Sequence, residues 1–173
     1  MTPLFNCYFR PFAQAQARIR YEPWFADDWV CKTGWSPSHA KPECVVFKLR
    51  RAHWSNDPTA AVRNASGLFF SVWVDEQFAA AGRMHYNIHA LKLRQLEGYA
   101  LESRKFAAAF RAGFRPYKKH WPKVRTDFGP QTLMQGWVKA SPEESVKIIL
   151  RLAENFQPLA ELIEGLLEKH ARD

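Results

Sequence analysis

Residues 67–75, GLFFSVWVD, constrain the fold more than any other part of the chain. Side chains of a β-strand alternate between two faces. One face would hold Leu68, Phe70, Val72 and Val74, and the other would hold Phe69, Ser71, Trp73 and Asp75. Both faces are mostly apolar, which is typical of a strand that is covered on two sides. We therefore expect a β-sheet with this strand at its centre.

Three other segments have strand patterns. Cys44–Arg51 is rich in β-branched and apolar residues, and Thr132–Ala140 alternates as an edge strand would. Met84–Leu93 is ambiguous, because Met84, Ile88 and Leu91 would also form the apolar stripe of a helix. The alternation is regular over seven residues and Gly82 precedes it, so we interpret this segment as a strand.

Helical patterns follow. From Glu102 to Phe114, phenylalanines recur at every fourth position among alanines, which predicts a helix with one buried side. Ser141-Pro-Glu-Glu144 has the pattern of a capping box and predicts the start of a second helix. Pro158 is expected to end or kink that helix near Gln157, with a further helix over Leu159–Lys169.

The first 42 residues are aromatic and show little regular pattern. Phe5, Tyr8 and Phe9 suit a short edge strand, Ala13–Ile19 suits one or two helical turns, and the tryptophans are expected to pack over the sheet. The predicted class is α+β, an antiparallel sheet of about four strands with helices on one face and an irregular aromatic N-terminal segment. We expect a single domain, 1–173, made of this segment (1–42), the sheet with a basic helix (43–140) and C-terminal helices (141–173).

The chain is basic, with 25 Lys and Arg against 17 Asp and Glu and a formal net charge of +8. Its last segment, 141–173, is acidic, so the positive charge lies in residues 1–140. This balance favours nucleic acid, a phosphate-bearing ligand or an acidic protein as the partner.

The cysteines and the hydropathy of the chain indicate in which cellular compartment the protein is expected. Cys7, Cys31 and Cys44 are odd in number and lack metal-site spacing, and the sequence has no leader-like segment and no apolar run of membrane-spanning length. We therefore expect a cytoplasmic protein without a membrane partner, a metal or a cofactor. The seven tryptophans make the chain Trp-rich.

The strongest functional signal is the stretch 103–126, which contains eight Lys and Arg and no Asp or Glu. At about 100° per residue, the predicted helix would bury its phenylalanines and present a line of arginines beside them. The following Tyr117-Lys-Lys-His-Trp121 mixes cations with rings, which suits phosphate contact combined with base stacking. The predicted nucleic-acid-binding residues are Arg104, Arg111, Arg115, Tyr117, Lys118, Lys119, Trp121 and Lys123.

An alternative function is a small-molecule-binding protein or enzyme with a pocket between the aromatic N-terminal segment and His85, Asn87 and His89. Two strand residues four positions apart lie roughly 13 Å from each other, too far to share one metal ion. His85, His89 and Asp75 are the weak catalytic candidates, although a turn or cap role suits Asp75 better. A second alternative is a protein-interaction module. No catalytic motif is present, so the sequence leaves enzymatic activity open.

Overall fold

The computed structural model describes residues 6–38, 41–57 and 66–173. A five-stranded antiparallel sheet has the strand order β1-β2-β3-β4-β5, so β3 lies at its centre. The strands are β1 (Trp29–Ser38), β2 (Lys41–Arg51), β3 (Gly67–Asp75), β4 (Arg83–Leu91) and β5 (Thr132–Lys139). The helices are α2 (Phe9–Ile19), α3 (Glu76–Ala81), α4 (Ser103–Phe114) and α5 (Ser145–Glu168). The predicted α+β class with an antiparallel sheet is confirmed.

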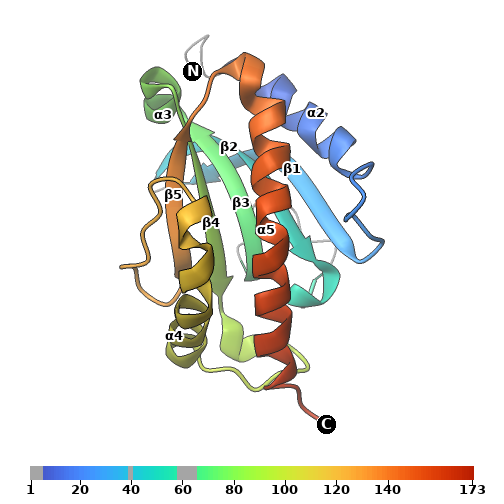
Figure 1. Ribbon diagram of the computed structural model, residues 1–173. Coiled ribbons are helices and arrows are strands. Elements are labelled where there is room, and N and C mark those ends of the chain that lie inside the picture. Colours follow the sequence, from blue (N-terminus) through green and yellow to red (C-terminus); the bar gives the residue numbers. More distant parts are fainter. Residues whose placement is uncertain (1–5, 39–40, 58–65) are drawn as a thin grey trace.

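The helices α2, α4 and α5 lie on one face of the sheet, which we call the helix face (Figure 1). The long helix α5 runs across the middle of this face and contacts both α2 and α4. The short helix α3 connects β3 to β4 at one end of the sheet. The opposite side of the sheet is called the outer face, and none of α2, α4 and α5 lies over it.

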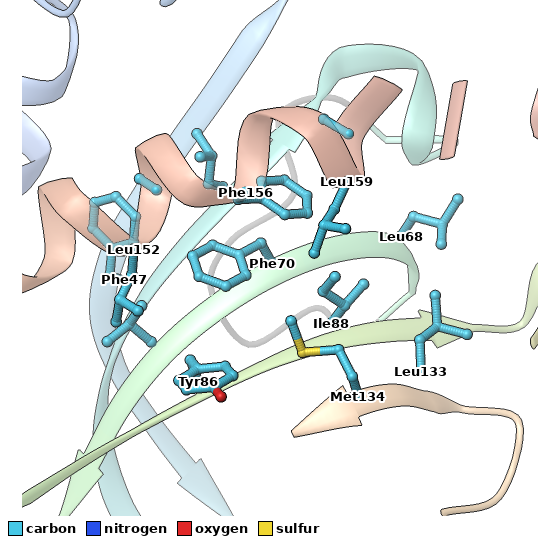
Figure 2. Close-up of a cluster of buried hydrophobic side chains, with 14 of the residues drawn as sticks. Phe47, Leu68, Phe70, Tyr86, Ile88, Leu133, Met134, Leu152, Phe156 and Leu159 are labelled. Atoms are coloured by element: carbon cyan, nitrogen blue, oxygen red, sulfur yellow. The ribbon is translucent and has the colours of Figure 1, made fainter. Parts of the chain in front are cut away.

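The core lies between the sheet and α5. Figure 2 shows Phe70 and Ile88 of the central strands directed toward Phe156 and Leu159 of α5. The rings of Phe70 and Phe156 are stacked with centroids 4.7 Å apart. On β3 the helix-face residues are fully buried, and Phe69 on the outer face is only 4% exposed. The prediction of a central strand is therefore confirmed, and side chains on both of its faces are largely buried.

The N-terminal segment is more regular than we expected. It contains α2 and β1, so the sheet has five strands where about four were predicted. Tyr8 and Phe9 lie at the start of α2 and not in an edge strand, while Phe5 lies outside the described residues. The helix forms because Phe12, Ala15 and Ile19 recur with helical spacing and are all fully buried.

The C-terminal segment also differs from the prediction. A 3-10 turn, Pro142–Glu144, precedes α5, and α5 continues through Pro158 to Glu168 as one helix where two were expected. The Ser141 hydroxyl donates to the Glu144 carboxylate and does not cap a backbone N–H. Leu159, Ala160 and Ile163 beyond the proline are fully buried, and this burial stabilises the helix against the break that proline favours.

Candidate polyanion-binding site

The acid-free stretch forms α4, a 3-10 segment (Arg115–His120) and the loop that leads to β5. These parts follow one another along the β5 side of the molecule (Figure 1). Phe106, Phe110 and Phe114 are buried, which confirms the predicted apolar side of the helix. Five cations of the stretch are exposed and have no carboxylate partner within the described part of the chain. These five, which we call the basic surface, are Arg104, Arg115, Lys118, Lys119 and Lys123.

Two other cations of the stretch are paired with nearby acids. Lys105 contacts Glu102 at 3.1 Å and Arg125 contacts Asp127, all four side chains being exposed. The acidic helix α5 forms its ion pairs elsewhere. Glu161 contacts Arg51, and Glu164 contacts both His53 and the indole N–H of Trp54. The carboxylates of α5 therefore leave the basic surface unneutralised.

Arg111 holds the loop before β5 in place. Its Nε donates to the carbonyl of Leu133, and its Nη2 donates to the carbonyls of Phe128, Gly129 and Thr132 at 2.9–3.1 Å. Nε and Nη2 carry three of the five N–H donors of the guanidinium, so most of its donors are directed at backbone carbonyls. We therefore treat Arg111 as a residue that positions the loop beside the basic surface.

The two rings predicted to stack on bases are turned inward. Trp121 is 3% exposed and packs against Phe70 and Tyr86, with centroid distances of 5.9 and 5.0 Å. Tyr117 is half-buried and packs against the core. The Tyr86 hydroxyl also donates to the Pro122 carbonyl, which fixes the chain just after Trp121. In this arrangement neither ring is presented to a base in the way the sequence suggested.

The outer face carries a polar row that the sequence analysis missed. The strand register aligns one residue from each strand, in the order Lys32, Lys48, Ser71, Asn87 and Gln135. The Ser71 hydroxyl donates to Oδ1 of Asn87, and Nδ2 of Asn87 lies 3.5 Å from Oε1 of Gln135. Each of these five residues occupies one of the alternate positions whose side chains point to the outer face. Only the pairing register, which the sequence does not state, brings the five together.

Lys48 is the charged group nearest the middle of this row. Its side chain is half-buried, and Nζ lies 4.2 Å from the centroid of the Phe69 ring. Burial lowers the pKa of Lys48 to about 8, an effect that the nearby Cys44 opposes and Arg50 reinforces. Among the described residues no carboxylate pairs with this ammonium group. Lys48 is thus a partly desolvated cation held over an aromatic ring.

Aromatic side chains flank the polar row toward α3. Trp73, His85 and Trp137 are aligned on three neighbouring strands. The His85 ring stacks on Phe78 of α3 at 3.6 Å and lies 4.9 Å from Trp73. Both of its ring nitrogens are buried and have no hydrogen-bond partner in the described structure. Desolvation lowers the pKa of His85 to about 4, while Asp75 acts to raise it and Arg83 to lower it. This imidazole is therefore neutral at physiological pH.

The alternative pocket is not formed as predicted. His85, Asn87 and His89 lie on the outer face, but Trp29 of the aromatic N-terminal segment packs on the helix face against Trp54 and Phe156. The two groups lie on opposite sides of the sheet, so they cannot line one cavity. Met84–Leu91 is a strand, as predicted, and Nδ1 of His89 lies 3.2 Å from both the Gln131 carbonyl and the Thr132 hydroxyl.

Asp75 has a local structural role. Its carboxylate accepts a hydrogen bond from the backbone N–H of Phe78 and caps α3, as its position at the end of the strand suggested. Gly82 ends that helix in the left-handed conformation, with φ 65°. Through this cap, Asp75 positions Phe78 over His85.

A small pocket of about 140 Å³ lies at the opposite end of β3 and β4. It is lined by Asn56, Ser66, Gly67, Lys92, Gln95 and Leu96. The two polar atoms of the Asn56 amide are occupied, since Nδ2 donates to the Gln95 carbonyl and Oδ1 accepts from the N–H of Glu97. Lys92 is the one charged residue of its lining, so the pocket adds little to the positive charge of the basic surface.

Comparison of the chain with models of protein families, with curated proteins and with solved structures found no match. Within the ranges that the structure covers, no helix has both the length and the apolar character needed to cross a membrane. Within the described ranges, none of Cys7, Cys31 and Cys44 forms a disulfide.

Proposed function

We propose that the protein binds nucleic acid through the basic surface of α4 and the segment that follows it, in the reducing cytoplasm. The observation that carries the proposal is the set of five exposed cations that lack a carboxylate partner in the described structure. Exposed Lys and Arg side chains are the groups that contact phosphates, and these contacts supply most sequence-independent affinity.

The proposal makes binding depend on salt. Each phosphate contact releases counterions, and the slope of log K against log salt is roughly −0.9 per contact for duplex DNA. If all five cations of the basic surface contact phosphates, the slope is about −4.5. The affinity is then expected to fall steeply between low and physiological salt concentration.

The test is a titration of labelled nucleic acid at several salt concentrations with a charge-reversed variant, Arg115→Glu, Lys118→Glu, Lys119→Glu. All three positions are exposed, so the fold should tolerate the changes. The matched control reverses three exposed cations of the last segment, Lys147→Glu, Arg151→Glu and Lys169→Glu, and gives the same change in net charge.

We expect the first variant to lose most of the affinity and to lower the magnitude of the salt slope by about 3. The control variant should retain most of the affinity and most of the salt slope. Equal weakening by the two variants would show that only net charge matters, and undiminished binding by the first variant would refute the proposal.

A further inference from the structure

Building on the proposed function, we infer that the bound nucleic acid is single-stranded and that its bases lie on the outer face of the sheet, with the first contact at Trp137. The basic surface supplies phosphate contacts, and the outer face supplies rings and hydrogen-bond donors for unpaired bases.

Trp137 of β5 joins the two surfaces. Nζ of Lys123, a member of the basic surface, lies 5.8 Å from the centroid of the Trp137 ring. The guanidinium of Arg83, at the start of β4, lies over the same ring, 4.0 Å from its centroid, and covers part of one ring face. Trp137 is half-buried and aligned with His85 on the outer face. A strand of nucleic acid that leaves the basic surface at Lys123 would therefore meet an aromatic ring flanked by two cations.

The outer face carries cations on β1 and β2, across the sheet from Trp137, that suit an anionic ligand. Its polar row has an ammonium group on each of two neighbouring strands, Lys32 and Lys48, and an amide at its other end, Gln135. At the described outer-face positions of the strands, Asp75 is the only carboxylate, and it is 7% exposed and engaged in capping α3. The charge of this face is thus positive, with little acidic side chain to repel a phosphate.

The shape of the face favours unpaired bases over a duplex. Ser71 and Asn87 are only 3% and 2% exposed, so they lie below the larger side chains around them. The rings of Trp73 and Trp137 are half-buried. A duplex keeps its bases stacked inside and is read by an element that enters a groove, whereas unstacked bases can lie flat on rings of a sheet. Rings recessed in the face of a sheet therefore suit single strands.

The experiment compares a labelled single strand of about 12 nucleotides with a duplex of the same length, a length within the usual range of single-strand sites. Binding is measured by fluorescence anisotropy with the full chain and with Trp137→Leu, which removes the ring and keeps an apolar side chain. The matched control is Trp24→Leu, a half-buried tryptophan that packs with Trp29 and Phe25 away from the outer face. Circular dichroism and thermal unfolding check that each variant is folded.

We expect the single strand to bind about 10-fold more tightly than the duplex. Trp137→Leu should weaken single-strand binding by about 5- to 100-fold, the range for loss of one stacked base, and leave duplex binding unchanged. The control should bind like the parent. Equal affinity for both nucleic acids, or no effect of Trp137→Leu on the single strand, would overturn the inference.

A second variant covers the case in which Trp137→Leu fails to fold. Arg83→Gln changes an exposed side chain and is expected to weaken single-strand binding about 3- to 10-fold. Its control is Arg94→Gln, at an exposed position past the other end of β4. Photo-crosslinking of the bound strand should label residues 132–139, and labelling confined to 103–126 would overturn the inference.

These results separate the two proposals. If neither nucleic acid binds in a salt-dependent manner, the proposed function itself fails. If the single strand and the duplex both bind, and only the charge-reversed variant of the basic surface weakens their binding, the proposed function stands and the outer-face inference fails.

Discussion

His85 illustrates how the environment of one residue decides its chemistry. In the sequence it was a weak catalytic candidate, since an unperturbed imidazole titrates near neutral pH. In the structure the ring is stacked on Phe78 and both nitrogens lack partners in the described part of the chain. A buried polar atom without a hydrogen bond destabilises the fold. The neutral ring therefore acts as part of an aromatic stack.

The lowered pKa of His85 predicts a dependence of stability on pH. An unfolded histidine has a pKa near 6.5, while His85 in the folded protein has a pKa of about 4. The unfolded state therefore takes up a proton first as the pH decreases. The stabilising contribution is complete above pH 6.5 and declines toward pH 4, by up to about 1.4 kcal/mol per pH unit.

The test is His85→Phe, which keeps a ring of similar shape and cannot be protonated. We expect its urea unfolding free energy to be at least that of the parent at pH 7 and to decline less between pH 6.5 and 4. His120→Phe, at an exposed position, serves as the control and should keep the parental pH profile. A parental profile in His85→Phe would contradict the assignment.

At the scale of elements, α4 and the start of β5 are linked by one side chain. The four carbonyls that Arg111 binds all belong to residues 128–133, so this guanidinium defines where the loop turns into the strand. Gly136 further along β5 also has a packing role. A Cβ there would lie 2.2 Å from the Tyr86 hydroxyl, which holds Pro122. The loop beside the basic surface is thus fixed at both ends.

The contacts of Arg111 predict that replacing arginine by lysine lowers the free energy of unfolding much more at position 111 than at position 115. Arg111→Lys replaces a fork of donors by a single ammonium group, which cannot reach all four carbonyls. We expect it to lower the free energy of unfolding by about 2–3 kcal/mol. Arg115→Lys, at an exposed position, should change it by less than about 0.5 kcal/mol. Urea unfolding of both variants measures the difference, and equal values would contradict the role of Arg111.

At the scale of the whole molecule, Phe156 of α5 joins segments that are distant in the chain. Its fully buried ring stacks on Phe70 of β3 and contacts Trp29 of β1 and Trp54 after β2 at 6.2 and 6.0 Å. Aromatic contacts of this kind add to the free energy gained by burial. The N-terminal strand, the central strand and the C-terminal helix therefore share one core.

Truncation of Phe156 tests this arrangement. Phe156→Ala should lower the free energy of unfolding by about 3–5 kcal/mol, because it removes buried contacts and leaves a cavity. The emission of Trp29 and Trp54 should change at the same time, since both indoles contact the lost ring. Phe128→Ala, in the half-buried loop before β5, is the control and should cost clearly less. Equal losses in both variants would contradict a central role for Phe156.

The sequence by itself determined the elements whose patterns are local. The alternation in 67–75 predicted a central strand, and the recurrence of phenylalanine in 102–114 predicted α4, because side-chain periodicity depends only on backbone geometry. The exposure of Arg104 on α4 follows from the same periodicity, whereas Lys105 and Arg111 of that helix contact Glu102 and the loop before β5. β1 was missed because tryptophans, a glycine and a proline obscure its alternation.

The tertiary structure decided which residues meet. Strand register aligned Lys48 with Ser71, and the path of the loop before β5 placed Lys123 beside Trp137. Long-range packing also buries Trp121 in the core and lets α5 continue through Pro158. It brings the loop before β5 to the guanidinium of Arg111, which donates to backbone carbonyls there. Such outcomes depend on competition among long-range contacts, and a local pattern holds no information about the partners available.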